Sequence, residues 1–424
     1  MPALTVGRVG GELPAKWRLV PRCSGMLTLP AMGENRFHIG QWLLLSDYGE
    51  LARRYMLTSW VCVAGLALVV STWLPMSTLS IDQASWSELA SSLIYSAAAC
   101  AFYFVASHRL RKDENRIAVY LHAALERLAL LFRGCLSIAT VGGVGLIFTY
   151  LATAAALPLQ DAFLAKLDGH LGFHWPSVLG AINDRPVLAD LMTKAYGSTA
   201  LMTQGVVIWL SVRRFGERLA EFLALLCLCS LGLAVGMLLV PAAGAFVYFE
   251  PAQQLFDNFA AGREMWPFLD AFNALRDGSL TKINISSVQG VVSFPSFHTM
   301  LGIITTYALR DTRALFIPAA ILNGTMILAT LPVGGHYLVD TVAGAAIGIA
   351  AFHWLRHAVG HRALSGRVES FGINGIALTG KQVLGRLFVT ILFRLKRYAL
   401  ECVFVGRVAC SAAYVALVNL LGHF

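Results

Sequence analysis

Eight long apolar runs constrain the fold of this 424-residue chain more than any other feature of its sequence. A helix needs roughly 18 or more apolar residues to cross about 30 Å of hydrocarbon, and most of the runs reach that length. The composition agrees, because 57% of the residues are hydrophobic and only 13% are charged. The sequence therefore predicts an all-α integral membrane protein. The runs cover residues 56–75, 89–107, 136–157, 191–212, 222–248, 296–309, 314–331 and 336–355.

The basic residues predict the orientation of these runs. The net charge is +9, and Arg and Lys gather before the first run and after every second run. The connections in between are poor in basic residues, and residues 76–88 and 332–335 contain none. The positive-inside rule then places the N-terminus, the basic loops and the tail in the cytosol. We expect a protein of the bacterial inner membrane, with its active site facing the periplasm or a lumen, and no nucleic-acid partner.

The cysteines and the N-terminus indicate no further processing or metal chemistry. The eight cysteines lie mostly inside apolar runs without a CxxC pair, which predicts neither a disulfide framework nor a metal site. The first run begins more than fifty residues from Met1, and no signal-peptide pattern precedes it. We therefore expect no segment to be removed and no cofactor to be bound.

The order of the runs predicts four parts. Residues 1–54 form a cytosolic segment, in which "IGQWLLLSDYGELARRYM" can form an amphipathic helix on the membrane surface. Residues 55–107 add two transmembrane helices to a six-helix catalytic core over residues 134–357. Residues 358–424 form a basic amphipathic tail that attracts anionic lipids, although residues 399–421 can also be a ninth span. The oligomeric state is not predicted.

Two loops of mixed polarity lie on the non-cytosolic side of the predicted core. The loop 159–186 is too polar to cross the membrane, and its aromatic residues suit the headgroup zone. The loop 251–292 has the same character and the same side. We interpret the first as an interfacial lid over the mouth of the core.

Two short strings at this end carry candidate catalytic residues. In "FPSFH", Pro295 precedes a helix start whose free amides, around Ser296 to His298, predict an anion site. In "GGHYLVD", His336 and Asp340 are four residues apart, which predicts that they share one helix face. The carboxylate can then fix the tautomer of His336 and leave its other ring nitrogen as a nucleophile.

The two strings resemble the motifs of the type-2 phosphatidic acid phosphatase superfamily. Its usual motifs are KxxxxxxRP, PSGH and SRxxxxxHxxxD, carried on a six-helix membrane core. The resemblance implies that His336 becomes a phosphohistidine, that Asp340 orients it, and that His298 is the general acid for the leaving group. It is strong only at the two strings, within roughly residues 136–356.

The sequence departs from those motifs at several positions, and two of the family's phosphate-binding cations are missing. Phe297 replaces a glycine, Ala329 and Thr330 replace the Ser-Arg pair, and no KxxxxxxRP is present. The FPSxH form, with Thr330 in place of the arginine, resembles the inositol phosphorylceramide synthase branch. Arg276 and Lys282, just before the sixth run, are candidates for replacing the lost charge, with headgroup contact as the alternative for both.

The predicted phosphate site therefore combines several kinds of group. Ser296 and the nearby amides hold the phosphate, Gly335 allows close approach, and Thr330 stands where the family has its arginine.

Three functions remain open from the sequence. The first is a metal-independent phosphatase or phosphotransferase that acts on a lipid phosphate, with water or a polyol or other alcohol as acceptor. The second is a phospho-headgroup transferase of the inositol phosphorylceramide synthase type. The third is a non-catalytic lipid binder or flippase, which predicts the loss of His298, His336 or Asp340, and none of these is lost.

Overall fold

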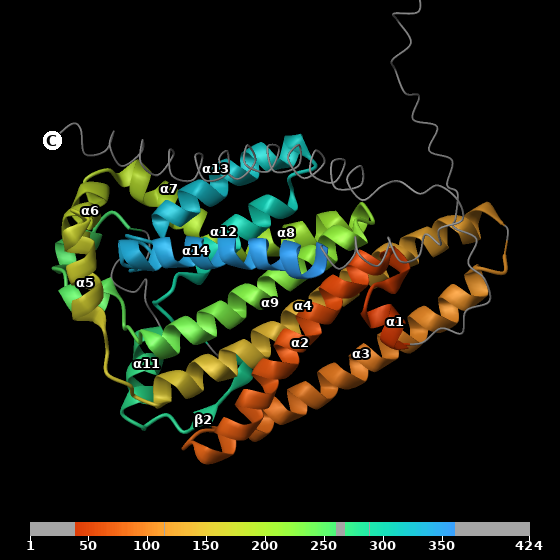
Figure 1. Ribbon diagram of the computed structural model, residues 1–424, viewed down its shortest axis with the longest axis horizontal. Helices are drawn as coiled ribbons and strands as arrows, with labels where there is room; N and C mark the ends of the chain where they lie inside the picture. Colours follow the sequence, from red (N-terminus) through yellow and green to blue (C-terminus); the bar gives the residue numbers. More distant parts are fainter. Residues whose placement is uncertain (1–38, 114, 260–267, 288, 361–424) are drawn as a thin grey trace, which may run out of the picture. The chain divides into compact units, whose positions relative to one another are not determined.

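The computed structural model describes residues 39–113, 115–259, 268–287 and 289–360 (Figure 1). The predicted cytosolic segment before residue 39 and the predicted basic tail from residue 361 lie outside the described residues. Within them the structure is almost entirely helical. The helices are α1 (Ile39–Leu43), α2 (Glu50–Trp73), α3 (Gln83–Leu110), α4 (Arg116–Ala154), α5 (Asp161–His170), α6 (Trp175–Asn183), α7 (Pro186–Gly197), α8 (Thr199–Val212), α9 (Gly216–Leu239), α10 (Ala245–Phe249), α11 (Phe268–Arg276), α12 (Phe297–Ala308), α13 (Arg313–Ala329) and α14 (Leu338–Leu355).

Five helices in the described part of the chain are long and apolar enough to cross a membrane, which confirms the predicted all-α integral membrane fold. The shorter apolar helices are α8 and α13. The five segments are Glu50–Met76, Gln83–Leu110, Arg116–Ala154, Gly216–Leu239 and Leu338–Val359.

Several predicted elements differ from the structure in their extent. The run 136–157 is the second half of α4, which begins at Arg116. The predicted amphipathic helix over residues 39–56 is wrong, because the chain turns at Leu45 and Gly49, both with positive φ, between α1 and α2. The run 191–212 is divided at Ser198 into α7 and α8. The run 222–248 stops being helical at Leu239, two residues before Pro241, because proline disfavours helical geometry in the residue before it.

Helix α9 lies at the centre of the packing and contacts α2, α4, α12 and α14. Its side chains Phe222, Leu223 and Leu225 are almost fully buried in the largest apolar cluster. Helix α2, which the sequence assigns to an added hairpin, packs closely on α9, whereas α3 packs mainly on α4 (Figure 1). The first of the two extra helices is therefore part of the main bundle.

A two-stranded parallel sheet joins the α2–α3 hairpin to the segment before α12. Strand β1 (Ser80–Ile81) pairs with β2 (Lys282–Ile283), with Ser80 opposite Lys282 and Ile81 opposite Ile283. The amide of Ile285 also donates to Ser85 Oγ at 2.8 Å. These contacts hold the hairpin against the end of the bundle that carries α11.

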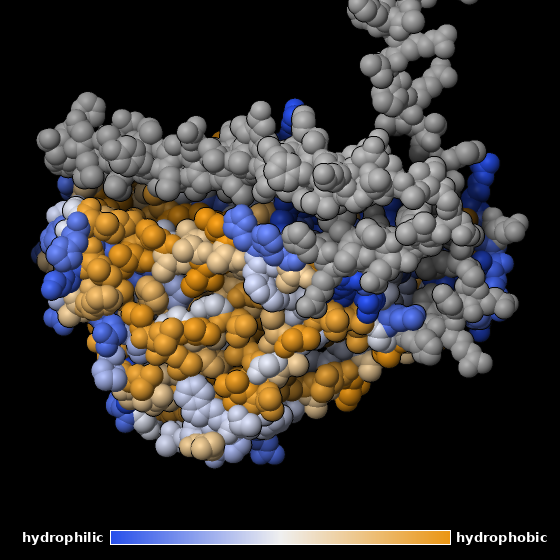
Figure 2. All heavy atoms as spheres, viewed as in Figure 1, coloured by the Kyte–Doolittle hydropathy of each residue, from blue (hydrophilic) through white to orange (hydrophobic). Residues whose placement is uncertain are grey.

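The hydrophobic surface follows the lengths of the helices. On the face seen in Figure 2, hydrophobic residues cover the middle of the helices, and hydrophilic residues gather near α5 and α6 at one end and near the α3–α4 connection at the other. Side chains such as Leu68, Leu93 and Phe102 are each about two-thirds exposed. This distribution is what a lipid environment around the bundle requires.

Candidate active site

The centre of the site is the pair His336 and Asp340, just before and within the first turn of α14. His336 Nδ1 lies 3.2 Å from Asp340 Oδ2. The prediction that both residues lie on one helix face is wrong in detail, because α14 begins only at Leu338. The pair meets because Asp340 points back toward the residues that precede the helix, where its Oδ2 also accepts the amide of Tyr337 at 3.1 Å.

Asp340 is fully buried and joins the two catalytic strings of the sequence. Its Oδ2 accepts the hydroxyl of Ser293 at 3.0 Å, and its backbone oxygen accepts the amide of Ser296 at 3.0 Å. A carboxylate is only an acceptor, so the proton of a neutral His336 ring lies on Nδ1. The other nitrogen, Nε2, then carries the lone pair that a nucleophile needs.

His298 lies in the first turn of α12, and its ring is stacked on that of Tyr196 from α7. The ring centroids are 4.3 Å apart at an interplanar angle of 22°, and the Tyr196 hydroxyl lies 3.4 Å from His298 Nδ1. Tyr196 also lies beside Gly334, two residues before His336. Through this ring, the structure brings both histidines to one end of the bundle.

Ser296 is the N-cap of α12, one residue after Pro295. Its Oγ accepts hydrogen bonds from the amide and the hydroxyl of Thr299, at 3.4 and 3.1 Å. The helix begins at Phe297, so the amides of Phe297 and His298 belong to the turn that has no acceptors within an α-helix. These amides are groups of this turn that can bind an anion, and Ser296, predicted as a phosphate ligand, caps the turn.

The turn before His336 is closely packed. A Cβ at Gly334 would lie 2.8 Å from His336 Cδ2 and 3.0 Å from Tyr196 Cε2, so only glycine fits between these rings. Gly335 has a φ of 64°, which glycine adopts without strain, and its oxygen accepts the amide of Ala245 at 2.9 Å. Thr330 is fully buried, and its backbone oxygen accepts the amide of His336 at 3.1 Å.

The segment that contains these groups is also the segment for which a comparison with known families found a match. Residues 162–354 match the family model of the PAP2 superfamily. The match supports the PAP2 superfamily for this chain and, in general terms, a function of the lipid phosphatase type. No curated protein and no solved structure matches the chain. Helices α2 and α3 and all of α4 lie before the matched segment.

At the start of the PAP2 match, helix α5 carries two aspartates that hold the His336 segment in place, Asp161 just before the matched residues and Asp168 within them. Asp168 accepts the amides of Leu338 and Val339, the first two of α14, at 2.8 and 3.0 Å. Asp161 accepts the hydroxyl of Tyr337 at 3.0 Å. It also accepts two amides from the connection after α9, those of Ala243 and Gly244, at 3.0 and 2.9 Å.

Helix α6 adds a further contact, because Trp175 is buried and donates from Nε1 to the oxygen of Leu331 at 2.8 Å. The loop 159–186, interpreted from the sequence as a lid, thus braces the turn that carries His336.

The pH dependence of the melting temperature should report the contact of Asp168 with the start of α14. Burial, together with a smaller effect of the nearby Asp340, raises the pKa of Asp168 to about 6, although the two amide donors lower it. Because the folded state holds this proton more tightly than the unfolded chain, the carboxyl stabilises the fold most below about pH 4, and the effect is lost as the pH rises through about 6. We expect acidification from pH 7.5 to pH 5 to raise the melting temperature of the wild type in detergent by about 3 °C more than that of Asp168→Asn.

The control for this measurement is Asp190→Asn, which removes an exposed carboxylate on α7 that pairs with Lys194. Its melting temperature should follow the wild type across the same pH range. Parallel curves for the wild type and Asp168→Asn would show that Asp168 keeps an ordinary acidity in the fold.

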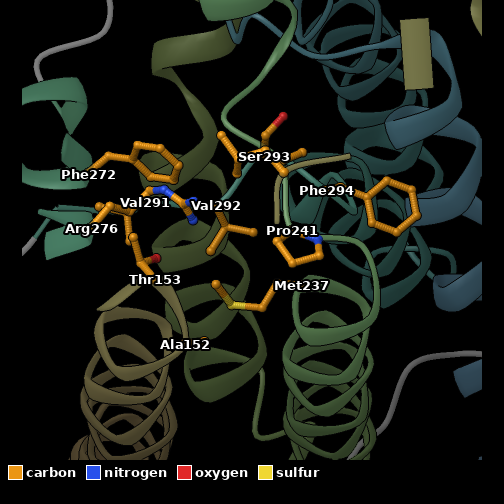
Figure 3. A pocket seen from close by; sticks show the side chains of 12 residues that line it. Ala152, Thr153, Met237, Pro241, Phe272, Arg276, Val291, Val292, Ser293 and Phe294 are labelled. Carbon is orange, nitrogen blue, oxygen red and sulfur yellow. The ribbon is translucent and has the colours of Figure 1, made fainter. Parts of the chain in front are cut away.

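Arg276, a candidate phosphate ligand, lies beside the site and not in it. Its Nη1 donates to the oxygen of Leu157 at 3.1 Å, and its guanidinium lies over the ring of Phe272. It lines a pocket that also includes Ser293 and Phe294, with Arg276 and Phe294 on opposite sides (Figure 3). Neither histidine lines this pocket. Ser293, which lines this pocket with Arg276, donates to Asp340.

Lys282, the other candidate cation, faces the α2–α3 hairpin. It is exposed, and it lies in strand β2 opposite Ser80. Hydrogen bonds from Ser85, and to a smaller extent the charge of Lys282, lower the pKa of Asp82 at the start of α3. The described contacts of Lys282 therefore join the hairpin and not the two histidines.

Several residues of the site were not singled out from the sequence. Asp161 and Asp168 are seven residues apart, a spacing that places both on one face of a helix. This spacing could have predicted that the two aspartates of α5 act together. Tyr196 carries no such signal, because it reaches the site only through the tertiary fold. Ser293 adjoins the FPSFH string, but its bond to Asp340 arises only in the tertiary fold. Within the described ranges, no cluster of three or more His, Cys, Asp or Glu is arranged to hold a metal ion.

Proposed function

We propose that this protein is a membrane-embedded enzyme that takes the phosphoryl group from a lipid-linked phosphate onto His336 and passes it to an acceptor. The observation that carries the proposal is the hydrogen bond between His336 Nδ1 and the buried Asp340. It leaves Nε2 as the nucleophile, and His298 stands beside it as a second acid–base group.

The reaction has two steps. In the first, the lone pair of His336 Nε2 forms a bond to phosphorus as the bond from phosphorus to the lipid oxygen breaks, and protonated His298 gives its proton to that oxygen. In the second, neutral His298 takes a proton from water or an alcohol, whose oxygen attacks phosphorus as the bond to His336 breaks. His298 ends protonated and His336 neutral, as they began.

The phosphate oxygens need donors, and the groups closest to the histidines are neutral. The amides at the start of α12 and the turn at Gly335 supply backbone donors, and the helix dipole adds positive potential. Ser296 supports this turn as its cap. Thr330 stands where the family has an arginine, so this position brings no charge. Its hydroxyl forms a hydrogen bond with the hydroxyl of Thr341 at 3.1 Å.

Arg276 lines a pocket together with Ser293, and Lys282 does not line it. We propose that Arg276 neutralises a phosphate from this pocket, and that Lys282 attracts the anionic headgroup at the mouth. No metal is required by these steps. The basic loops lie at the opposite end of the helices, which favours a periplasmic or lumenal site with a cytosolic N-terminus.

The acceptor separates the two enzymatic forms of the proposal. Purified protein should be incubated with ³²P-labelled phosphatidic acid in detergent, with and without a polyol such as inositol. A phosphatase releases labelled inorganic phosphate in both mixtures. A transferase gives a new labelled product only with the polyol. The absence of an arginine at Thr330 favours a phospho-headgroup transferase of the inositol phosphorylceramide synthase type as the second candidate. Its test needs a labelled lipid phosphodiester as donor, because that transfer moves the phosphate together with its headgroup. Binding of labelled lipid without any turnover would instead favour the non-catalytic lipid binder and overturn the proposal.

A further inference from the structure

The two histidines of the site have partners of different chemistry. His336 Nδ1 faces the carboxylate of Asp340, which only accepts, so this partner favours one arrangement of protons on the ring. His298 Nδ1 faces the hydroxyl of Tyr196 at 3.4 Å, and a hydroxyl both donates and accepts. The hydroxyl can therefore donate to neutral His298 and accept from protonated His298.

This difference matches what each ring must do in the proposed reaction. His336 needs a lone pair on Nε2 before every attack, which a fixed acceptor on Nδ1 maintains. His298 must alternate between protonated and neutral forms, and a partner that suits only one form would oppose the other. Tyr196 is the described group that contacts Nδ1 of His298 and tolerates both forms.

The position of Tyr196 is set by close packing. Its ring is stacked on the ring of His298, and its Cε2 lies beside Gly334, next to His336. Helix α7, which carries it, packs on α13, at whose end the turn to His336 begins. The phenol ring thus contacts the ring of His298 and the turn that carries His336.

We infer that Tyr196 is a positioning residue for the general acid, acting through His298 and leaving the nucleophile unaffected. The inference rests on the proposed function. It has a specific consequence, because help from a general acid matters only when the leaving oxygen needs a proton. The alkoxide of a glycerolipid needs one, whereas 4-nitrophenolate leaves without it at neutral pH.

The test is Tyr196→Phe, which keeps the stacked ring and removes the hydroxyl. The kcat/KM should be measured for dioctanoyl phosphatidic acid and for 4-nitrophenyl phosphate, because this parameter reports the first, phosphoryl-accepting step. We expect a loss of about 10- to 100-fold for the lipid, below the full effect of a general acid, and less than a twofold change for the aryl ester. The matched control, Tyr103→Phe, removes a buried hydroxyl that donates to Glu126 at 3.0 Å, and it should leave the ratio of the two rates unchanged.

The ratio keeps the test valid if part of the variant misfolds, because both rates then fall together. An equal loss for the two substrates, or no loss for either, overturns the role of Tyr196. Failure of the proposed function gives a different result, since wild-type protein would then form no acid-labile ³²P adduct from either substrate.

Discussion

Replacing His336 with alanine is expected to abolish turnover while the protein remains folded and inserted. The side chain is nearly buried and interacts with Asp340, but Tyr337, Leu338 and Val339 keep their own bonds to α5, so the turn should persist without the imidazole. Removal of a catalytic nucleophile costs on the order of 10⁴-fold or more in kcat. The measurement is release of phosphate, or formation of the transfer product, from purified protein in detergent.

A trapping experiment distinguishes the roles of the two histidines. Wild-type protein quenched during turnover of ³²P-labelled lipid should carry an acid-labile, base-stable label, as a phosphohistidine does. His336→Ala should carry none. His298→Ala should be labelled slowly and lose its label slowly, because the same base serves the second step. Turnover by purified His336→Ala, or a label that survives in it, would remove His336 as the nucleophile.

Gly344→Ala is expected to cause the second largest loss, although Gly344 is remote from the reacting atoms. A Cβ at this position of α14 would collide with the backbone oxygen of Ser296, the cap of α12, and would press on Thr299. Backbone cannot move aside as a flexible side chain does, so α12 must shift away from α14. His298 lies two residues after Ser296, and a displacement of about 1 Å in a catalytic group can reduce the rate by 10²-fold.

The matched control for this effect is Gly348→Ala, one turn further along the same helix. A Cβ there would lie 3.7 Å from Ile303 Cδ1, an ordinary van der Waals contact. We expect Gly348→Ala to keep its activity within about twofold, and Gly344→Ala to lose about 100-fold with a lower melting temperature. Similar activities for the two variants would show that the α12–α14 contact does not set the distance between the histidines. The measurement is kcat on the lipid substrate, with melting temperature in detergent as the check on folding.

Much of the helical architecture could be predicted from the sequence. The apolar runs are long, and in lipid the chain has to form helices to satisfy its backbone, so α2, α3, α9, α14 and the second half of α4 follow from run length. The first half of α4, from Arg116, lies before the predicted run. The predictions that failed concern local backbone. The start of α14 at Leu338, after His336, and the turns at Leu45 and Gly49 depend on single φ values and on capping contacts that hydropathy does not record.

The candidate site divides in the same way. The sequence by itself determined that His298, His336 and Asp340 lie at one end of the helices, because each is at the start of an apolar run that begins on the same side. Only the tertiary structure decided what faces them. Tyr196 and Asp168 reach the site from elements far away in the chain, and Ser293, five residues before His298, bonds to the distant Asp340. Arg276 is held beside the site by Leu157. The physical reason is that membrane insertion depends on apolar length, which is a property of each segment, whereas hydrogen bonds and ring contacts depend on distances that arise only when the segments pack together.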